Sequence, residues 1–201
     1  MNKYIIFDLG QVIVDVDLKT FLINSSQEFK IDPAILTNNQ DDGVHEDFMI
    51  GKINGDEFHK RTCERFNHFV QIERFKDIWD TMLRGEIDGI SDIIEKLHQQ
   101  KYSLAVLSNT DSWHFEYCKI NFPVLQKFER IFLSYELKMK KPDSEIFLKV
   151  TKELNIDPND CVFIDDSTAN IAQAEKLNFR VVHFKNAEQL SQELVLMDIK
   201  I

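Results

Sequence analysis

Five short apolar runs, separated by helical patterns, constrain the fold of this chain more than any other feature. The runs lie at Lys3–Leu9, Tyr102–Ser108, Ile131–Leu133, Cys161–Asp165 and Arg180–Phe184. They are mostly apolar and do not alternate with polar residues, which is typical of strands covered on both faces of a parallel sheet. We therefore predict an α/β fold with a doubly wound, Rossmann-like parallel sheet.

Between the first two runs, the alternation of strand and helix is interrupted. Residues of about 16–86 contain no convincing strand, and one set of apolar positions there follows the i, i+3, i+4, i+7, i+8 spacing of an amphipathic helix. That set is Phe75, Ile78, Trp79, Met82 and Leu83. We predict an α/β core domain at 1–15 and 87–201, interrupted by an all-helical cap domain at 16–86.

Polar residues follow the predicted strands at the point where each one ends. The first strand leads to Asp8, the second to Ser108 and Asn109, and the fourth to the pair Asp165 and Asp166. In open α/β sheets, ligands lie outside the carboxyl ends of the strands, so these side chains are expected to converge. Lys141, which lies before a proline and a predicted helix, completes a set suited to phosphate and Mg²⁺.

Four motifs in this order resemble those of the haloacid dehalogenase superfamily with a helical cap. They read FDLGQV, LSNT, KKPDSEIF and VFIDD, and they span residues 5–166. Within the superfamily, the chain is most similar to the bacterial α-D-glucose-1-phosphate phosphatase group. The resemblance implies a Mg²⁺-dependent phosphatase that hydrolyses a small phosphorylated metabolite, such as a sugar phosphate or a sugar 1-phosphate, through an aspartyl-phosphate intermediate.

The resemblance also implies a role for each motif residue. Asp8 matches the nucleophile, and Lys141 matches the lysine that neutralises Asp8 and the phosphoryl oxygens. Ser108 and the backbone amide of Asn109 match the phosphate clamp. The implied metal ligands are Asp8, the backbone carbonyl of Gly10, Asp166 and Asp165. Asp165 contacts the metal either directly or from the outer shell, and Asn170 is a further polar neighbour of the metal site.

The first motif departs from the phosphatase pattern at Gly10. Most phosphatases of the superfamily have an aspartate there, which protonates the leaving alcohol and later activates water. A glycine keeps the backbone carbonyl but removes the general acid, whose contribution is typically ~10²–10⁴-fold. We therefore expect a slow enzyme, a substitute acid, or a substrate with a good leaving group such as an anomeric phosphate.

Several residue assignments stay open at this point. Asp15 or Asp17 is able to replace the missing acid, although such residues more often cap a turn. Lys140 is the alternative to Lys141 as the lysine that neutralises the phosphoryl oxygens. His114 lies just after the second motif and is able to reach the substrate, although a histidine there more often packs on its helix. Three other functions remain: a catalytically weak or inactive sugar-phosphate-binding protein, a 2-haloacid dehalogenase-like hydrolase, and a phospho-acceptor signalling domain.

Charge and composition limit the binding partners and the cellular compartment that we expect for this protein. The formal net charge of −10 argues against nucleic acid or an anionic membrane as the main partner. No run reaches the ~18 apolar residues of a membrane helix, and Asp8 interrupts the first run too early for a signal peptide. The three cysteines form no CxxC pair, which favours a reducing, cytoplasmic location. We expect a monomer or a weak homodimer.

Overall fold

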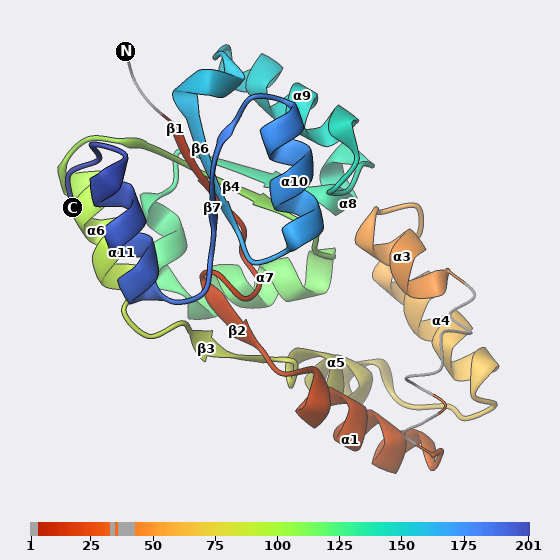
Figure 1. Cartoon of the computed structure of the whole chain (residues 1–201). Helices are drawn as coiled ribbons and strands as arrows, with labels where there is room; N and C mark the ends of the chain where they lie inside the picture. Colours follow the sequence, from red (N-terminus) through yellow and green to blue (C-terminus); the bar gives the residue numbers. More distant parts are fainter. Residues whose placement is uncertain (1–3, 33–34, 36–42) are drawn as a thin grey trace.

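The computed structural model describes residues 4–32, 35 and 43–201. A five-stranded sheet lies at its centre, with every neighbouring pair parallel and the order β5-β4-β1-β6-β7 (Figure 1). The strands are β1 (Tyr4–Phe7), β4 (Ser103–Ser108), β5 (Arg130–Leu133), β6 (Cys161–Asp165) and β7 (Arg180–His183). The expected doubly wound α/β fold is confirmed, although the predicted first residue of β1, Lys3, lies outside the described residues.

Helices cover both faces of this sheet, which is why its strands are apolar on both sides. Successive residues of β1 point to opposite faces, so Ile5 and Phe7 belong to one hydrophobic cluster and Ile6 to another. The first face is covered by α6 (Ile90–Gln99), α7 (Ser112–Asn121) and α11 (Ala187–Leu196). The second is covered by α9 (Ser144–Leu154) and α10 (Thr168–Lys176).

Short elements complete the connections around the sheet. They are α8 (Ser134–Leu137) and the 3₁₀ helices η1 (Pro123–Lys127) and η2 (Pro158–Asp160). Within the described residues, no helix has both the length and the apolar character required to cross a lipid bilayer.

The segment between β1 and α6 forms a separate group of helices beside the sheet (Figure 1). They are α1 (Leu18–Phe29), α3 (Val44–Met49), α4 (Gly55–Arg65) and α5 (Ile72–Asp80). We call these helices the cap, and their apolar side chains form a hydrophobic cluster of their own. The domain boundaries expected from the sequence stay a prediction, and residues 33–34 and 36–42 of the expected cap lie outside the described part.

Two short strands join the cap to the sheet, and the sequence did not predict them. β2 (Val14–Val16) pairs antiparallel with β3 (Leu83–Glu86). The predicted helix through Leu83 is therefore wrong at its end, because α5 stops at Asp80 and Leu83 begins β3. Strands of three and four residues are too short to show a period in the sequence, and only their pairing identifies them.

One aromatic side chain from the core is built into the cap. Trp113, at the start of α7, has its ring centroid 5.2 Å from that of Phe48 and 6.0 Å from that of Phe58. The ammonium of Lys76 lies 4.8 Å from the centroid of the same ring. The cap is therefore anchored to the core through shared aromatic packing as well as through its two chain connections.

This packing makes Gly55 a test of the contact between cap and core. A Cβ atom at Gly55 would lie 2.2 Å from the Trp113 ring, whereas one at Gly85 would meet no atom within 4 Å. We expect Gly55→Ala to lower the free energy of unfolding by about 1–3 kcal/mol through overpacking, despite the better helix propensity of alanine. Gly85→Ala is the control, and equal urea midpoints for the two variants would contradict this packing.

Candidate active site

The carboxyl ends of three neighbouring strands place the candidate side chains together. Asp8 follows β1, Ser108 ends β4 and Asp165 ends β6, and β1 lies between the other two. The backbone amide of Asp8 donates to the carbonyl of Ile164 at 2.8 Å, which continues the ladder past the end of β1. Residues that are more than 150 positions apart in sequence therefore meet at one edge of the sheet.

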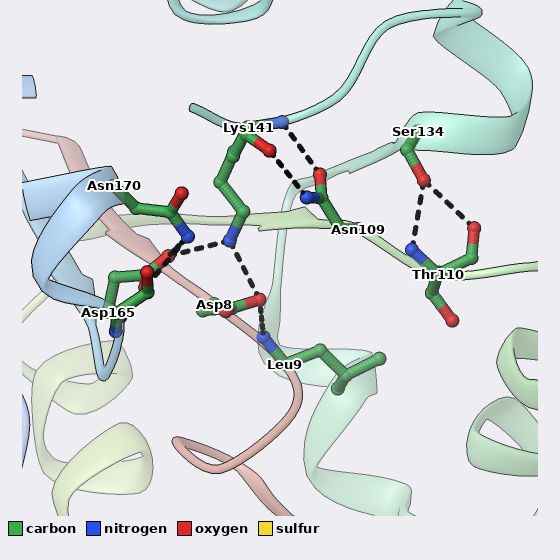
Figure 2. A network of polar contacts seen from close by, with 9 residues as sticks. Asp8, Leu9, Asn109, Thr110, Ser134, Lys141, Asp165 and Asn170 are labelled. Atoms are coloured by element: carbon green, nitrogen blue, oxygen red, sulfur yellow. Dashed lines mark hydrogen bonds and ion pairs between the residues drawn. The ribbon is translucent and has the colours of Figure 1, made fainter. Parts of the chain in front are cut away.

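Lys141 lies between the two buried carboxylates of this edge (Figure 2). Its Nζ atom is 2.9 Å from Oδ1 of Asp8 and 2.7 Å from Oδ2 of Asp165. The side chain of Lys141 is only 1% exposed. Its neighbour Lys140 instead pairs with Glu46 of the cap at 2.7 Å. The two lysines left open by the sequence thus have different positions, and Lys141 is the one that contacts Asp8.

The side chain of Asn109 holds the backbone of Lys141 in place. Its Nδ2 donates to the Lys141 carbonyl at 2.8 Å, and its Oδ1 accepts from the Lys141 amide at 2.8 Å (Figure 2). These paired bonds join the loop after β4 to the loop before α9. The sequence motif predicts a role only for the backbone amide of Asn109 and does not reveal this side-chain contact.

Asp165 is fixed by several donors, whereas Asp166 is exposed. Nδ2 of Asn170 lies 3.0 Å from both carboxylate oxygens of Asp165, and the amide of Ser167 donates to Oδ1 at 2.8 Å. Oxygens of Asp8, Asp165 and Asp166 lie within 4.8 Å of one another. Carboxylate oxygens are the ligands that Mg²⁺ prefers, so the chemistry of this donor set fits that ion.

The electrostatics of Asp8 indicate an excess of negative charge at this cluster. Burial, followed by the charge of Asp165, raises the pKa of Asp8 to about 7, even though Lys141 opposes the shift. Burial and Asp165 also raise the pKa of Asp166 above its ordinary value. One lysine therefore does not balance three carboxylates, and a divalent cation would stabilise their ionised forms.

A cavity of about 140 Å³ lies between the sheet edge and the cap, and Leu9 and Gly10, which follow Asp8 in the chain, line it. The core side is lined by Gly10, Ser108 and Asn109, and the cap side includes His45 and Met49. The candidate phosphate-binding residues therefore border the same space as Gly10. Asp17 lies elsewhere as the N-cap of α1, where it accepts from the amide of Thr20 at 3.1 Å.

Ser134 links the second motif to the cap, a contact that was not predicted from the sequence. Its hydroxyl accepts from the amide of Thr110 at 2.9 Å and donates to the carbonyl of Met49 at 2.6 Å. Its side chain is fully buried. A serine that directly follows a predicted strand was the available signal, since the same pattern pointed to Ser108.

A buried ion pair beside the cavity lies at the start of α7, and its histidine also contacts α5. Nδ1 of His114 lies 3.1 Å from Oδ2 of Asp111, and its Nε2 lies 3.0 Å from the carbonyl of Trp79. Burial opposes the charged form of His114, but the Asp111 charge and these acceptors outweigh it, so its pKa is raised. The protonated imidazole is therefore favoured, and in that form both ring nitrogens face protein oxygens.

Replacing His114 is expected to change how stability depends on pH. Because its folded-state pKa is raised, His114 contributes stability that is fully present below its unfolded pKa of about 6.5 and is lost as pH rises through the folded value. We expect the stability difference between wild type and His114→Gln, measured by urea unfolding from pH 6 to 9, to shrink as pH rises. A difference that is constant with pH would show that folding does not raise the pKa of His114.

The neighbouring Asp80 also titrates and must be separated from His114 in this test. Burial raises its pKa to about 6, and its Oδ1 is buried without a hydrogen-bond partner among the described residues. Its stability contribution is present below its unfolded pKa near 4 and falls as pH rises through about 6. Because the charge of His114 lowers the pKa of Asp80, the comparison is also made in an Asp80→Asn background, where the remaining pH dependence reports on His114.

Comparison with known proteins identifies relatives that match nearly the whole chain. A model of haloacid dehalogenase-like hydrolases matches residues 5–184. D-ribitol-5-phosphate phosphatase of Bacteroides thetaiotaomicron is 29% identical, over 98% of each chain. A haloacid dehalogenase-family enzyme of the same species, solved with magnesium and inorganic phosphate, is 32% identical with a TM-score of 0.85, over 95% of this chain and 98% of that one.

A third relative shows how far this fold extends without close sequence similarity. A haloacid dehalogenase-like hydrolase of Porphyromonas gingivalis is 22% identical, covers 100% of both chains and has a TM-score of 0.84. At this identity the likeness concerns the fold alone. The cap helices and the sheet therefore occur together in proteins whose sequences differ widely.

Proposed function

Because this chain belongs to the haloacid dehalogenase-like hydrolases, we propose that it is a magnesium-dependent phosphatase of a small phosphorylated metabolite, with Asp8 as the nucleophile. The observation that carries this proposal is the position of the Lys141 ammonium, in contact with both Asp8 and Asp165. The magnesium and phosphate bound by the similar B. thetaiotaomicron enzyme support the same assignment.

The proposed reaction has two displacements at phosphorus. An oxygen of ionised Asp8 attacks the phosphorus, the bond to the substrate oxygen breaks, and that oxygen leaves with a proton as an alcohol. Water then attacks the aspartyl phosphate, which releases inorganic phosphate and returns the Asp8 carboxylate. Lys141 favours the ionised form of Asp8 and stabilises the phosphoryl oxygens, and Ser108 and the backbone amide of Asn109 bind those oxygens from the other side.

Magnesium would be held by Asp8, Asp166, the carbonyl of Gly10 and, directly or through water, Asp165. When bound, it would neutralise charge on the phosphoryl group and favour the ionised form of Asp8. The fixed orientation of Asp165 by Asn170 and Ser167 prepares this set before substrate arrives.

The substrate class is proposed as a sugar or polyol phosphate. The cavity of about 140 Å³ is small, and the relative of known activity acts on D-ribitol 5-phosphate. We propose two types of substrate, a polyol 5-phosphate and a sugar 1-phosphate. The sugar 1-phosphate was expected from the sequence because its leaving group is good. The two differ in chemistry, because a primary alcohol leaves poorly unless it is protonated.

Turnover of p-nitrophenyl phosphate, with Mg²⁺ and with EDTA, tests the proposed function. This substrate has a good leaving group, so a missing general acid does not hide activity. We expect turnover with Mg²⁺ and none with EDTA. Phosphate release from ribitol 5-phosphate, glucose 1-phosphate and glucose 6-phosphate then ranks the substrates.

The same assays separate the remaining alternatives. Tight binding of a sugar phosphate, measured by calorimetry, without turnover of any substrate would favour a binding protein. Metal-independent release of halide from a 2-haloacid would favour a dehalogenase. Either result would contradict the proposed phosphatase.

A further inference from the structure

The cavity beside Gly10 is where the leaving group of a phosphate ester would lie. It extends from Gly10, Ser108 and Asn109 to His45 and Met49 of α3. If phosphate is held at the sheet edge, the rest of the substrate faces α3. A proton donor for the leaving oxygen must therefore be sought among the side chains that line this space.

Four titratable side chains line the cavity, and three of them are unsuited to proton donation. Burial raises the pKa of Cys118 to about 12, so its proton is held too tightly. Asp111 and His114 form the buried ion pair, in which both ring nitrogens of His114 face protein acceptors. Asp111 also accepts from the amides of Trp113 and His114, at 2.9 and 3.0 Å. The fourth is His45.

Contacts between α3 and the core fix the position of His45. The next residue, Glu46, pairs with Lys140, and the carbonyl of Met49 accepts from Ser134. Just beyond the helix, the carbonyl of Gly51 accepts from Lys138. The His45 ring also lies edge-on to Trp79, with centroids 5.3 Å apart and an interplanar angle of 77°. His45 is thus held on a helix that is docked against the loop carrying Lys141.

We propose that His45 donates the proton to the leaving oxygen, in place of the carboxyl group that Gly10 lacks. This inference rests on the proposed phosphatase function. As the bond between phosphorus and the leaving oxygen breaks, the imidazolium of His45 gives its proton to that oxygen and becomes neutral. The water that later attacks the aspartyl phosphate keeps its protons on the released phosphate, and the imidazole takes up a proton from solvent, so the cycle closes.

An imidazole suits this role near neutral pH, because its ordinary pKa is about 6.5. The protonation of His45 depends on the charged and titratable side chains of α3 and of the elements packed around it. These groups are Glu46 and Asp47 on α3, His59 on α4, Asp80 on α5, Asp111 and His114 on α7, and Lys140 across the interface.

The proposal predicts a rate loss that depends on the leaving group. In His45→Gln, we expect kcat for an alkyl phosphate such as ribitol 5-phosphate or glycerol phosphate to fall by about 10²-fold, the low end of general acid catalysis. Turnover of p-nitrophenyl phosphate should change by less than about threefold, since its leaving group needs no proton. The alkaline limb of the kcat–pH profile, where the imidazolium loses its proton, should disappear. His68→Gln changes a cap histidine outside this cavity and is the matched control.

Introducing a carboxyl group at position 10 is a second test, because it supplies the general acid that His45 is proposed to replace. Gly10 does not have a positive φ, and a Cβ atom there would lie 3.3 Å from Cγ2 of Val16, so a side chain needs only a small shift of Val16. We expect Gly10→Asp in the His45→Gln background to recover at least tenfold of the lost rate on the alkyl phosphate. His45→Asn serves as a second variant if His45→Gln does not fold.

The outcomes distinguish this inference from the proposed function itself. If wild type does not turn over p-nitrophenyl phosphate with Mg²⁺, the phosphatase function fails and the role of His45 fails with it. If wild type is active but His45→Gln slows aryl and alkyl phosphates equally, or slows neither, only the assignment of His45 is overturned. A retained alkaline limb in the variant would overturn it as well.

Discussion

Asp8→Asn is expected to lower phosphatase turnover by ~10⁴-fold or more, because an amide is neither a nucleophile nor an anionic metal ligand. The fold should remain intact, since the amide oxygen of asparagine is able to accept the hydrogen bond that Leu9 donates to Asp8 at 2.6 Å. The measurement is kcat for p-nitrophenyl phosphate with Mg²⁺, together with the urea midpoint.

Stability should change in the opposite direction to activity in this variant. The pKa of Asp8 is raised to about 7, so its ionised form is less favourable in the folded protein than in the unfolded chain. Removing the charge in EDTA at pH 8 should therefore leave stability unchanged or raise it. Asp88→Asn, which changes an exposed carboxylate, is the control. Full activity in a folded Asp8→Asn variant would reject Asp8 as the nucleophile.

Lys141→Met is expected to be strongly destabilising, by about 3–5 kcal/mol in EDTA, because it leaves two buried carboxylates without their cation. Nζ of Lys141 contacts Asp8 and Asp165, whose side chains are 13% and 0% exposed. Lys141 lowers the pKa of Asp8, so its removal should raise that pKa further above 7. The loss of stability should then be largest at alkaline pH and smaller as pH falls and Asp8 takes up a proton.

The adjacent lysine provides a matched control for this prediction. Lys140 pairs with Glu46 at the surface, where the two side chains are 33% and 50% exposed. Lys140→Met should therefore cost no more than about 1 kcal/mol in urea unfolding at the same pH. Similar losses for the two variants would mean that the buried position of Lys141 does not decide its contribution.

The sheet and the strand-end residues were predictable from the sequence because their signals are local. A strand buried on both faces must be apolar throughout, and β6 was predicted with both of its ends correct at Cys161 and Asp165. Parallel strands bring their carboxyl ends to one edge, so Asp8 and Asp165 were expected to meet before any contact was known. The resemblance to the family then suggested their roles.

The cap illustrates where local signals fail. Apolar spacing predicted a helix that continues through Leu83, but pairing with β2 ends it and begins β3 instead. Likewise, the sequence showed that Gly10 lacks a carboxyl group, yet not that its backbone has an ordinary φ and accepts a side chain. Backbone conformation and short strands depend on partners that are distant in the chain.

By itself, the sequence determined the fold class, the strand-end acids and the missing acid at Gly10, since each follows from residue type and local spacing. Only the tertiary structure decided that Lys141 and not Lys140 contacts Asp8, that Asn109 holds the Lys141 backbone, and that α3 brings His45 to the cavity. These contacts join residues that are more than 30 positions apart in the chain. Their geometry depends on how helices and loops dock, which no local pattern encodes.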